Sequence, residues 1–335
     1  MKQNIQIKGV GIYHPPVPVT NEQLYEHFDA RGIETRGLMK ALGRQTRYFV
    51  TNDSENALTM GIEAANCAIE NAGISAEDLD MIVFVTDTPE YLLPSNALKV
   101  HQAIGAMNAN LVYDLNTNCT GMIVAIDQVA KVMKATPNLN TALVVASTVF
   151  SRTVDKNNSF LRTAYNDGSG AFVLHKESSN AESGVIDTVT KVNSANHDLL
   201  VYPKAGLTPV LHGNATGEDA LFNFIPHSVD YFSEEWKELI VTLLERNGLT
   251  ANDIKAYMFQ QFSNDQNIET LSKLGVEPTE DNYVFVGEKY GYMGASCIAF
   301  AFHDALKAGK LTSGDYILFV SVAVGYTMAV SLYRI

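Results

Sequence analysis

Among the side chains that could perform chemistry, Cys119 has the most informative surroundings. It lies in the segment Asp114–Met122, between an apolar segment typical of a strand, Leu111–Tyr113, and a helical pattern rich in small residues. A thiol at the start of a helix faces unpaired N–H groups and the positive end of the helix dipole, which favour the thiolate. We therefore predict a nucleophile for covalent acyl transfer. The alternative is a buried cysteine that packs as a small apolar side chain.

The cysteine count argues against two other kinds of site. The three cysteines, Cys67, Cys119 and Cys297, are far apart, with no Cys-x-x-Cys pair and no Cys/His cluster. This spacing argues against a disulfide framework and against structural zinc. The sequence therefore predicts no metal site.

Composition and charge narrow the class of protein further. With 335 residues, of which 46% are hydrophobic and 18% charged, the chain can bury a large core. The net charge of −13 disfavours binding to nucleic acids or anionic membranes, which requires a basic surface. The N-terminus lacks the apolar stretch of a secretory signal, and no apolar run approaches the ~18 residues that span a bilayer. We expect a globular, cytoplasmic protein that binds neither nucleic acid nor membrane.

The cysteine segment belongs to a regular alternation of strand and helix patterns, which predicts a parallel α/β layout. Strands are expected at Met81–Val85, Leu111–Tyr113 and Ala142–Ala146, and helices at Ala57–Asn71, Asn96–Ile104 and from Cys119 onward. Because the strands are short and apolar throughout, the sheet should be covered on both faces.

An internal repeat organises the chain. The segment Asn71–Leu79 recurs as Asn247–Ile254, and the strands that follow carry Phe84 and Phe259, 175 residues apart. Each copy continues into a small-residue helix and then an apolar strand: Cys119–Val132 and Leu143–Ser147 in the first, Gly294–Leu306 and Ile317–Ser321 in the second. The same elements in the same order indicate two related halves.

We assign residues 1–176 to the first half and residues 177–335 to the second. The polar stretch Lys176–Asn180 is expected to join them. In a duplicated fold the two small-residue helices should be equivalent, buried and central. Cys119 would then start one of the two innermost helices.

Several other segments match a known family. They are Gly9–Pro15, Thr20–Glu22, Gly43–Arg47 and the turn Asn166–Ala171 before Phe172–Leu174. Together with the Cys119 segment they resemble the β-ketoacyl-(acyl carrier protein) synthase III family of the thiolase superfamily, over nearly the whole chain. The resemblance implies a five-layered αβαβα fold of two duplicated halves, a homodimer, and no cofactor beyond the acyl thioester substrate.

The same resemblance implies a mechanism. Such enzymes move an acyl group from a CoA thioester onto the cysteine, here Cys119, and then condense it with malonyl on acyl carrier protein, with loss of carbon dioxide. Backbone N–H groups must stabilise the tetrahedral oxyanion. The resemblance places these donors at Cys119 and, in the C-terminal loop, at Val324.

Two positions depart from the family pattern. The family has a His and an Asn that donate hydrogen bonds to the enolate formed by decarboxylation, and Gln260 and Tyr292 occupy those places here. A Gln amide can donate but cannot titrate, so it cannot serve as a general acid or base. We therefore expect acylation of Cys119 to persist and malonyl condensation to be slow or absent.

Two further residues are placed at the acyl pocket and its tunnel by the resemblance. His227 falls in a stretch that lines the tunnel and is the nearest substitute for the missing His, the alternative being an ordinary histidine at a helix start. Leu93 takes the place of an aromatic residue that reaches across the dimer to cap the acyl pocket. The alternative for Leu93 is plain interface packing.

These observations predict an acyltransferase of the synthase III type, in fatty-acid-like or specialised metabolism, with an acyl donor on CoA or on acyl carrier protein. The alternative is a catalytically degenerate scaffold subunit of a heteromeric acyl synthase, whose cysteine is a relic. Retention of Cys119 favours the enzyme, whereas loss of the His and the Asn favours the scaffold.

Overall fold

Nine strands form one hydrogen-bonded sheet of two parts, in a computed structural model that describes residues 1–335. The first part has the order β5–β4–β6–β7–β1: Leu111–Leu115, Met81–Val85, Thr141–Val149, Asp167–Ser179 and Lys2–Tyr13. The second has the order β11–β12–β13–β8: Ile254–Phe259, Tyr316–Ala323, Thr327–Arg334 and Gly184–Val192. A single pair, Ile5 with Gly184, connects the two parts through β1 and β8. The parts therefore behave as two sheets that touch at one edge.

Strand direction and register repeat between the two parts. β4 pairs in parallel with β5 and β6, and β6, β7 and β1 pair antiparallel in turn. β11 likewise pairs in parallel with β12 and, through Tyr257, with Tyr283, while β12, β13 and β8 pair antiparallel. Ile82 lies opposite Leu143, as Tyr257 lies opposite Leu318. The duplication predicted from the sequence is thus present in the topology.

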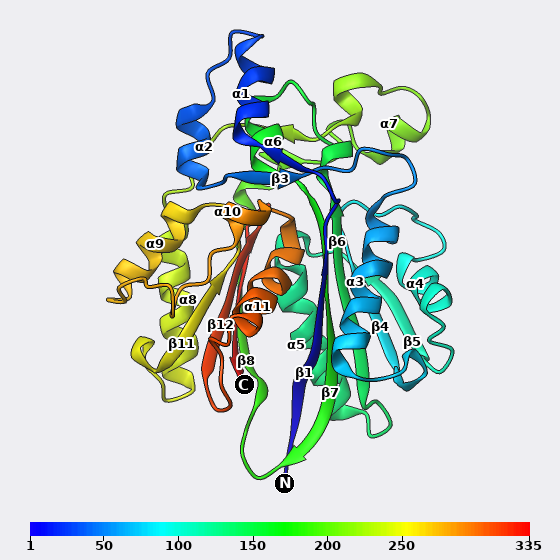
Figure 1. Cartoon of the computed structure of the whole chain (residues 1–335), viewed down its shortest axis with the longest axis vertical. Coiled ribbons are helices and arrows are strands. Elements are labelled where there is room, and N and C mark those ends of the chain that lie inside the picture. Colours follow the sequence, from blue (N-terminus) through cyan, green and yellow to red (C-terminus); the bar gives the residue numbers. More distant parts are fainter.

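Helices form three layers around the two sheets (Figure 1). α5 (Gly121–Ala135) and α11 (Cys297–Lys307) lie between the sheets, and the largest cluster of buried apolar side chains surrounds them. The outer helices are α3 (Ala57–Ala72) and α4 (Asn96–Ile104) on the first sheet, and α8 (Phe232–Arg246) and α9 (Asn264–Lys273) on the second. The predicted five-layered αβαβα fold is confirmed.

The start of α5 differs from the prediction. The helix expected from Cys119 begins as a 3₁₀ turn over Asn118–Thr120 and becomes α-helical only at Gly121. By contrast, the strand Met81–Val85 and the helix Asn96–Ile104 have the predicted bounds. The short turn before α5 determines where the thiol points.

The joint between the halves lies a few residues later than predicted. The polar stretch Lys176–Asn180 is almost entirely the end of β7, where Ser179 pairs with Lys2 of β1. Polar side chains are tolerated there because this end of the strand is partly exposed. The chain crosses to the second half over residues 180–183.

Shorter elements gather at one end of the molecule and cover the start of α5 (Figure 1). They are β2 (Pro18–Thr20), α1 (Asn21–Asp29), α2 (Arg36–Leu42), β3 (Thr46–Tyr48), α6 (Ser159–Ala164), β9 (Leu200–Val201), α7 (Leu207–Leu211), β10 (Asn223–Phe224) and α10 (Gly287–Tyr290). The buried guanidinium of Arg44 donates to the carbonyl oxygens of Ala164 at 2.5 Å and Phe262 at 2.7 Å. This side chain ties the covering elements to both halves.

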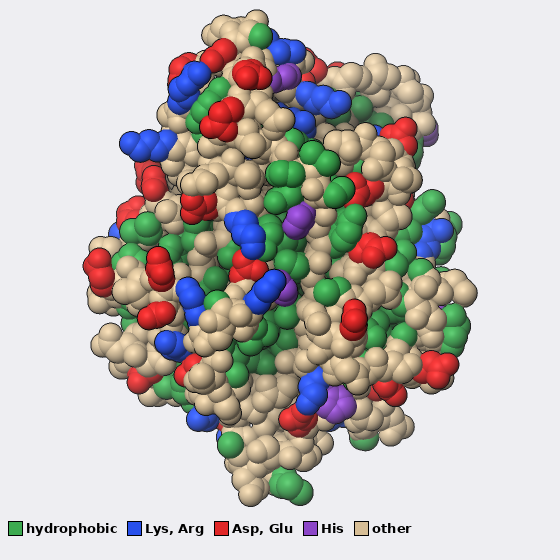
Figure 2. All heavy atoms as spheres, in the orientation of Figure 1, with side chains coloured by type: hydrophobic (Ala, Val, Ile, Leu, Met, Phe, Trp, Pro, Cys, Tyr) green, Lys and Arg blue, Asp and Glu red, His purple; other side chains and the backbone are tan.

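The surface carries charges of both signs. On the face shown in Figure 2, Lys and Arg side chains are interspersed with Asp and Glu. This face therefore offers no continuous basic surface of the kind that binds a phosphate backbone. None of the helices combines the length and the apolar character that a bilayer crossing requires.

Candidate active site

Cys119 is held in the turn between β5 and α5. Asn118 has a φ of 49°, a left-handed conformation that Asn tolerates better than most residues. At Gly121 a Cβ would lie 2.2 Å from Cγ1 of Val85, so the helix can approach β4 only with glycine there. The hydroxyl of Ser321, on β12, donates to the Cys119 carbonyl at 2.8 Å. Both halves of the fold therefore fix this turn.

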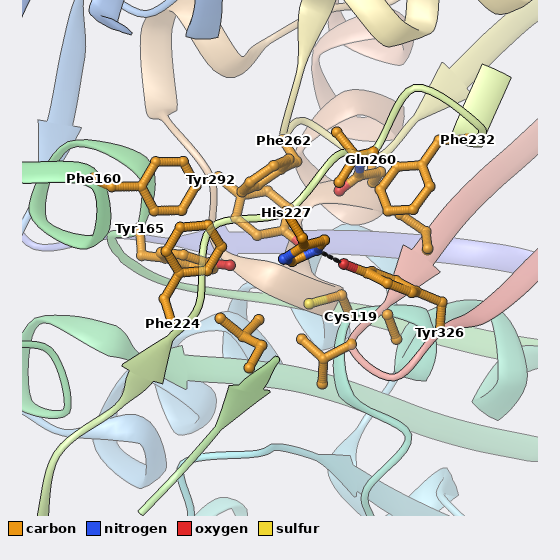
Figure 3. Close-up of a pocket in the computed structure, with 15 residues that line it drawn as sticks. Cys119, Phe160, Tyr165, Phe224, His227, Phe232, Gln260, Phe262, Tyr292 and Tyr326 are labelled. Carbon is orange, nitrogen blue, oxygen red and sulfur yellow. Dashed lines mark hydrogen bonds between the residues drawn. The ribbon is translucent and has the colours of Figure 1, made fainter. Parts of the chain in front are cut away.

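An apolar pocket opens onto the Cys119 thiol (Figure 3). Its cavity volume is about 150 Å³. Its aromatic and aliphatic walls consist of Phe160, Tyr165, Leu200, Phe224, Val229, Phe232, Phe262, Val322, Ala323 and Val324. Its other lining residues are Cys119, His227, Gln260, Tyr292 and Tyr326. An apolar pocket with a few convergent polar groups is the usual form of a small-molecule site.

The sequence predicted a thiol with a lowered pKa, and this prediction is wrong. Burial, the largest effect, raises the pKa of Cys119 far above its ordinary range, and the negative charge of Asp87 raises it further. A hydrogen bond with Tyr292 and the Cys119 N–H act in the opposite direction without outweighing burial. A helix terminus contributes about 1 kcal/mol, less than the cost of removing a thiolate from water. Cys119 therefore needs a proton acceptor when it reacts.

Gln260 follows β11 and lines the pocket (Figure 3). It is 1% exposed, yet neither Oε1 nor Nε2 has a hydrogen-bond partner. Its neighbour Gln261 differs, because its Nε2 donates to the Phe259 carbonyl and its Oε1 accepts from the Val286 N–H, both at 2.6 Å. A buried polar group without a partner costs roughly 1–3 kcal/mol. The unpaired amide of Gln260 is therefore available to a ligand.

Tyr292 is positioned by buried contacts. Its N–H donates to Oδ1 of Asn166 at 2.5 Å, and its carbonyl accepts from the Asn166 N–H at 3.0 Å. The ring centroid lies 5.2 Å from that of Phe262 and 5.6 Å from that of Tyr165. Burial raises the pKa of Tyr292 well above its usual range, and the neighbouring Cys119 raises it further. The phenol therefore stays protonated and can donate.

His227 and Tyr326 form a pair on the pocket wall (Figure 3). Nδ1 of His227 lies 2.7 Å from the Ile225 carbonyl, which can only accept, so Nδ1 carries the hydrogen. Nε2 therefore accepts from the Tyr326 hydroxyl. Close by in sequence, the N–H of Val324 donates no hydrogen bond within the chain. This N–H is free to bind an oxygen of a ligand.

Comparisons with known proteins identify the family. Residues 113–194 match the domain described as 3-Oxoacyl-[acyl-carrier-protein (ACP)] synthase III. Residues 244–335 match its C-terminal domain, and the two matches together cover about half of the chain. The chain belongs to the 3-oxoacyl-[acyl-carrier-protein] synthase III family. Members of this family form an acyl-cysteine intermediate, and Cys119 lies within the first matched segment.

Relatives and solved structures agree with this family. The β-ketoacyl-[acyl-carrier-protein] synthase III proteins of Solibacter usitatus and Erythrobacter litoralis are each 29% identical to this chain, over 98% of both chains. The crystal structure of 3-oxoacyl-[acyl-carrier-protein] synthase III from Aquifex aeolicus VF5 has the same fold, with a TM-score of 0.85 and 23% identity. It covers 99% of this chain and 100% of its own.

The structure brings most of the predicted site residues together. Five of them line one pocket: Cys119, His227, Gln260, Tyr292 and Val324. Leu93 lies elsewhere, on the loop between β4 and α4, where it is 89% exposed. Its assigned role requires a second copy of the chain and remains a prediction.

Sequence reasoning missed two parts of this site. The aromatic wall, which includes Phe160 and Phe224, comes from short elements far apart in the chain, and no periodicity marks them as neighbours. Asp87 was also missed, although it lies two residues beyond β4. Side chains at the ends of parallel strands gather at one edge of a sheet, and this signal could have identified Asp87.

Proposed function

We propose that the protein is an acyltransferase that receives an acyl group on Cys119 as a thioester and passes it to an acceptor. The observation that supports this proposal is the convergence of four groups on one apolar pocket. They are the Cys119 thiol, the unpaired Gln260 amide, the Tyr292 hydroxyl and the free Val324 N–H. The thiol supplies the covalent chemistry, so the reaction needs only an acyl thioester of CoA or of acyl carrier protein.

In the first step, Sγ of Cys119 attacks the carbonyl carbon of the donor thioester. The carbonyl becomes an oxyanion, which the N–H groups of Cys119 and Val324 would bind, each donor contributing roughly 3 kcal/mol. The bond between the carbonyl carbon and the donor sulfur then breaks, and the donor thiol leaves with the proton that Cys119 gave up. One thioester replaces another, so the overall free-energy change of this step is close to zero.

Gln260 and Tyr292 are suited to the second step, in which the acyl group passes from Cys119 to the acceptor. Both can donate hydrogen bonds to an acceptor oxygen that gains negative charge, such as the oxygen of an enolate. Neither exchanges protons readily at neutral pH, because the Gln amide does not titrate and burial raises the pKa of Tyr292. We therefore propose slow decarboxylative condensation with malonyl and faster transfer to an acceptor that needs no decarboxylation.

The pocket walls favour an apolar acyl group. Phe160 stacks on Phe224 with centroids 4.1 Å apart and meets Phe262 edge-on at 6.3 Å. No Lys or Arg side chain lines the pocket, so a carboxylate on the acyl chain would be desolvated without a partner. Straight-chain or aromatic acyl groups without charge are the proposed substrates.

Intact-mass measurement tests this proposal directly. The protein is incubated with acetyl-, butyryl-, octanoyl- and malonyl-CoA, and with the same groups on acyl carrier protein. We expect a covalent adduct with at least one uncharged acyl group, absent in Cys119→Ala and retained in Cys67→Ala, whose thiol is only half-buried. If no donor gave an adduct, the proposal would be contradicted. Rapid release of carbon dioxide from malonyl-CoA or malonyl carrier protein would contradict slow condensation.

A catalytically inert scaffold subunit is the second candidate. It is favoured by Gln260 and Tyr292, which leave these two positions without a group that titrates near neutral pH. In that case the wild-type protein and Cys119→Ala would both remain unmodified by every donor. The protein would also co-purify with a second synthase-like chain.

A further inference from the structure

Asp87 lies at the end of β4, as Gln260 lies at the end of the equivalent strand β11. The loop that carries Asp87 is held on both sides: the Thr86 N–H donates to the Leu115 carbonyl at 3.1 Å, and Thr88 Oγ1 accepts from the Val149 N–H at 2.9 Å. The hydrogen bonds of Thr86 and Thr88 therefore fix the backbone on both sides of Asp87.

A second cavity joins Asp87 to the nucleophile. Its volume is about 110 Å³, and its lining includes Asp87, Asn116, Asn118, Cys119 and Val324. Asp87 also lines a larger and more polar cavity of about 550 Å³, together with Glu90 and other polar residues. Asp87 thus lines both the cavity that reaches the thiol and an open, polar region of the surface.

The carboxyl group of Asp87 has no fixed partner at one oxygen. Its Oδ1 atom is buried and makes no hydrogen bond. Its negative charge raises the pKa of both Cys119 and Tyr165, and all three residues line the second cavity. A carboxylate that served only to hold the fold would be expected to have hydrogen-bond donors at both oxygens.

We propose that Asp87 is the general base and acid for acyl transfer at Cys119. This inference rests on the proposed function and adds the group that moves the proton. In acylation, the Asp87 carboxylate accepts the thiol proton as Sγ bonds to the carbonyl carbon, and then returns it to the departing donor thiolate. In the second step, it accepts the proton of the attacking acceptor and returns it to Sγ as the acyl–sulfur bond breaks.

The other groups that line the pocket are less suited to accept and return the thiol proton. Gln260 cannot titrate, and Nε2 of His227 is occupied by the hydroxyl of Tyr326. Tyr292 holds its proton because burial raises its pKa. Asp87 is left as the acceptor, with a free oxygen and a cavity that it shares with the thiol.

The protonation state of Asp87 fits the task. Burial, the largest effect, raises its pKa to about 6, so most of the carboxyl is ionised at pH 7 and can still hold a proton briefly. The charged groups that share its outer cavity are Asp53, Glu55, Glu90 and Arg152, and the titratable groups on its inner side are Cys119, Tyr165 and Tyr202. The acylation rate should therefore rise with pH through about 6 and then level off.

Two rates measured side by side test the assignment. Acylation is followed by quenched intact-mass analysis with octanoyl-CoA and, as an activated donor, p-nitrophenyl octanoate. Thiolate formation is followed by iodoacetamide labelling of Cys119, quantified by peptide mapping. In Asp87→Asn we expect acylation to slow by ~100-fold or more and to lose its rise near pH 6. Labelling should stay equal or become faster, because a negative charge near the thiol is removed.

Control variants separate the proton role from a structural one. Glu90→Gln removes a carboxylate from the outer cavity and should leave both rates unchanged. Asp87→Glu keeps the carboxyl and should recover part of the acylation rate together with its pH dependence. A structural defect in Asp87→Asn would instead slow labelling and acylation alike, and this outcome would overturn the proposal.

The remaining outcomes distinguish the two hypotheses. If the wild-type protein is acylated and Asp87→Asn is acylated at a similar rate, only the assignment of Asp87 fails. If the wild-type protein is acylated by no donor, the proposed function fails, and the assignment of Asp87 fails with it.

Discussion

Each half of the fold contains the same turn before its central helix, and only one of the two turns faces a pocket. Asn118–Thr120 precedes α5 and Gly294–Ser296 precedes α11, with positive φ values of 49° at Asn118 and 57° at Gly294. Cys119 and Ala295 occupy the same place in these turns. Cys119 lines the apolar pocket, whereas Ala295 packs near Gly121 and lines none of the main cavities.

The surroundings explain this difference. In the second turn, the hydroxyl of Ser296 donates to the carbonyl oxygens of Ala146 and Gly168, at 2.9 and 3.2 Å, and fastens the turn to the first sheet. In the first turn, the loop that carries Val324 and the elements β9 and β10 stand away from the thiol and leave a pocket. The duplicated fold therefore has two equivalent positions, and the surrounding loops leave a pocket at only one of them.

Moving the thiol from the first turn to the second should have the largest effect on acyl loading. We expect Cys119→Ala to lose acyl loading completely and the double variant Cys119→Ala/Ala295→Cys to remain inactive, because position 295 does not face the pocket. Intact-mass analysis with the best acyl donor measures this. Cys297→Ala serves as the control, since its buried sulfur accepts from the Met293 N–H and lies outside the pocket. Loading of the double variant would show that the two turns are chemically equivalent.

Two adjacent glutamines at the end of β11 test the distinction between fold and site. Gln261→Met would leave the N–H groups of Val286 and Gly287 without their acceptor at Oε1. We expect a loss of roughly 2–4 kcal/mol in the free energy of unfolding, because unpaired buried groups are costly. A thermal melt should show a clearly lower Tm. An unchanged Tm would mean that water replaces the side chain.

Gln260→Met should change the free energy of unfolding in the opposite direction. The substitution removes a buried amide that has no partner in the free protein, so the folded state should gain about 1 kcal/mol. The same variant should lose much of its acyl transfer, because a donor facing the pocket is gone. Thermal melts and single-turnover assays on one preparation check both effects. A lower Tm would indicate that the Gln260 amide already has a partner, such as an ordered water.

The smallest effect is expected at Asn118. Asn118→Gly reproduces the residue of the second turn, and because glycine adopts positive φ freely, the free energy of unfolding should change by no more than about 0.5 kcal/mol. Asn118→Ala is the matched control and should cost about 1 kcal/mol, because a Cβ disfavours the left-handed region. Urea unfolding of the three proteins measures the difference. Equal effects of both substitutions would mean that the Asn side chain itself holds the turn.

Much of the fold could be predicted from the sequence because its signals are local. The apolar strand Met81–Val85 is buried at every residue, and the helix Asn96–Ile104 ends at Gly105 in a left-handed cap. The repeat gave the arrangement of the halves, because the spacing of Phe84 and Phe259 is preserved in the strand registers.

Less of the site could be predicted, because it depends on contacts between distant segments. The thiol pKa was misjudged since burial of Cys119 depends on loops from both halves, which no local pattern reveals. The partner of His227 is Tyr326, almost one hundred residues away in sequence. The free oxygen of Asp87 likewise becomes visible only when its neighbours are placed around it.

The buried guanidinium of Arg44 bears on how a substrate enters. It bonds to carbonyl groups of the segment before Tyr165 and of the segment that carries Phe262, so these two walls cannot part without stranding a cation in the interior. The wall formed by β9 and β10 is held by fewer contacts, because these strands share only two residue pairs, and it includes the half-buried His227. We therefore expect an acyl chain to enter past β9 and β10 rather than between the two segments that Arg44 holds together.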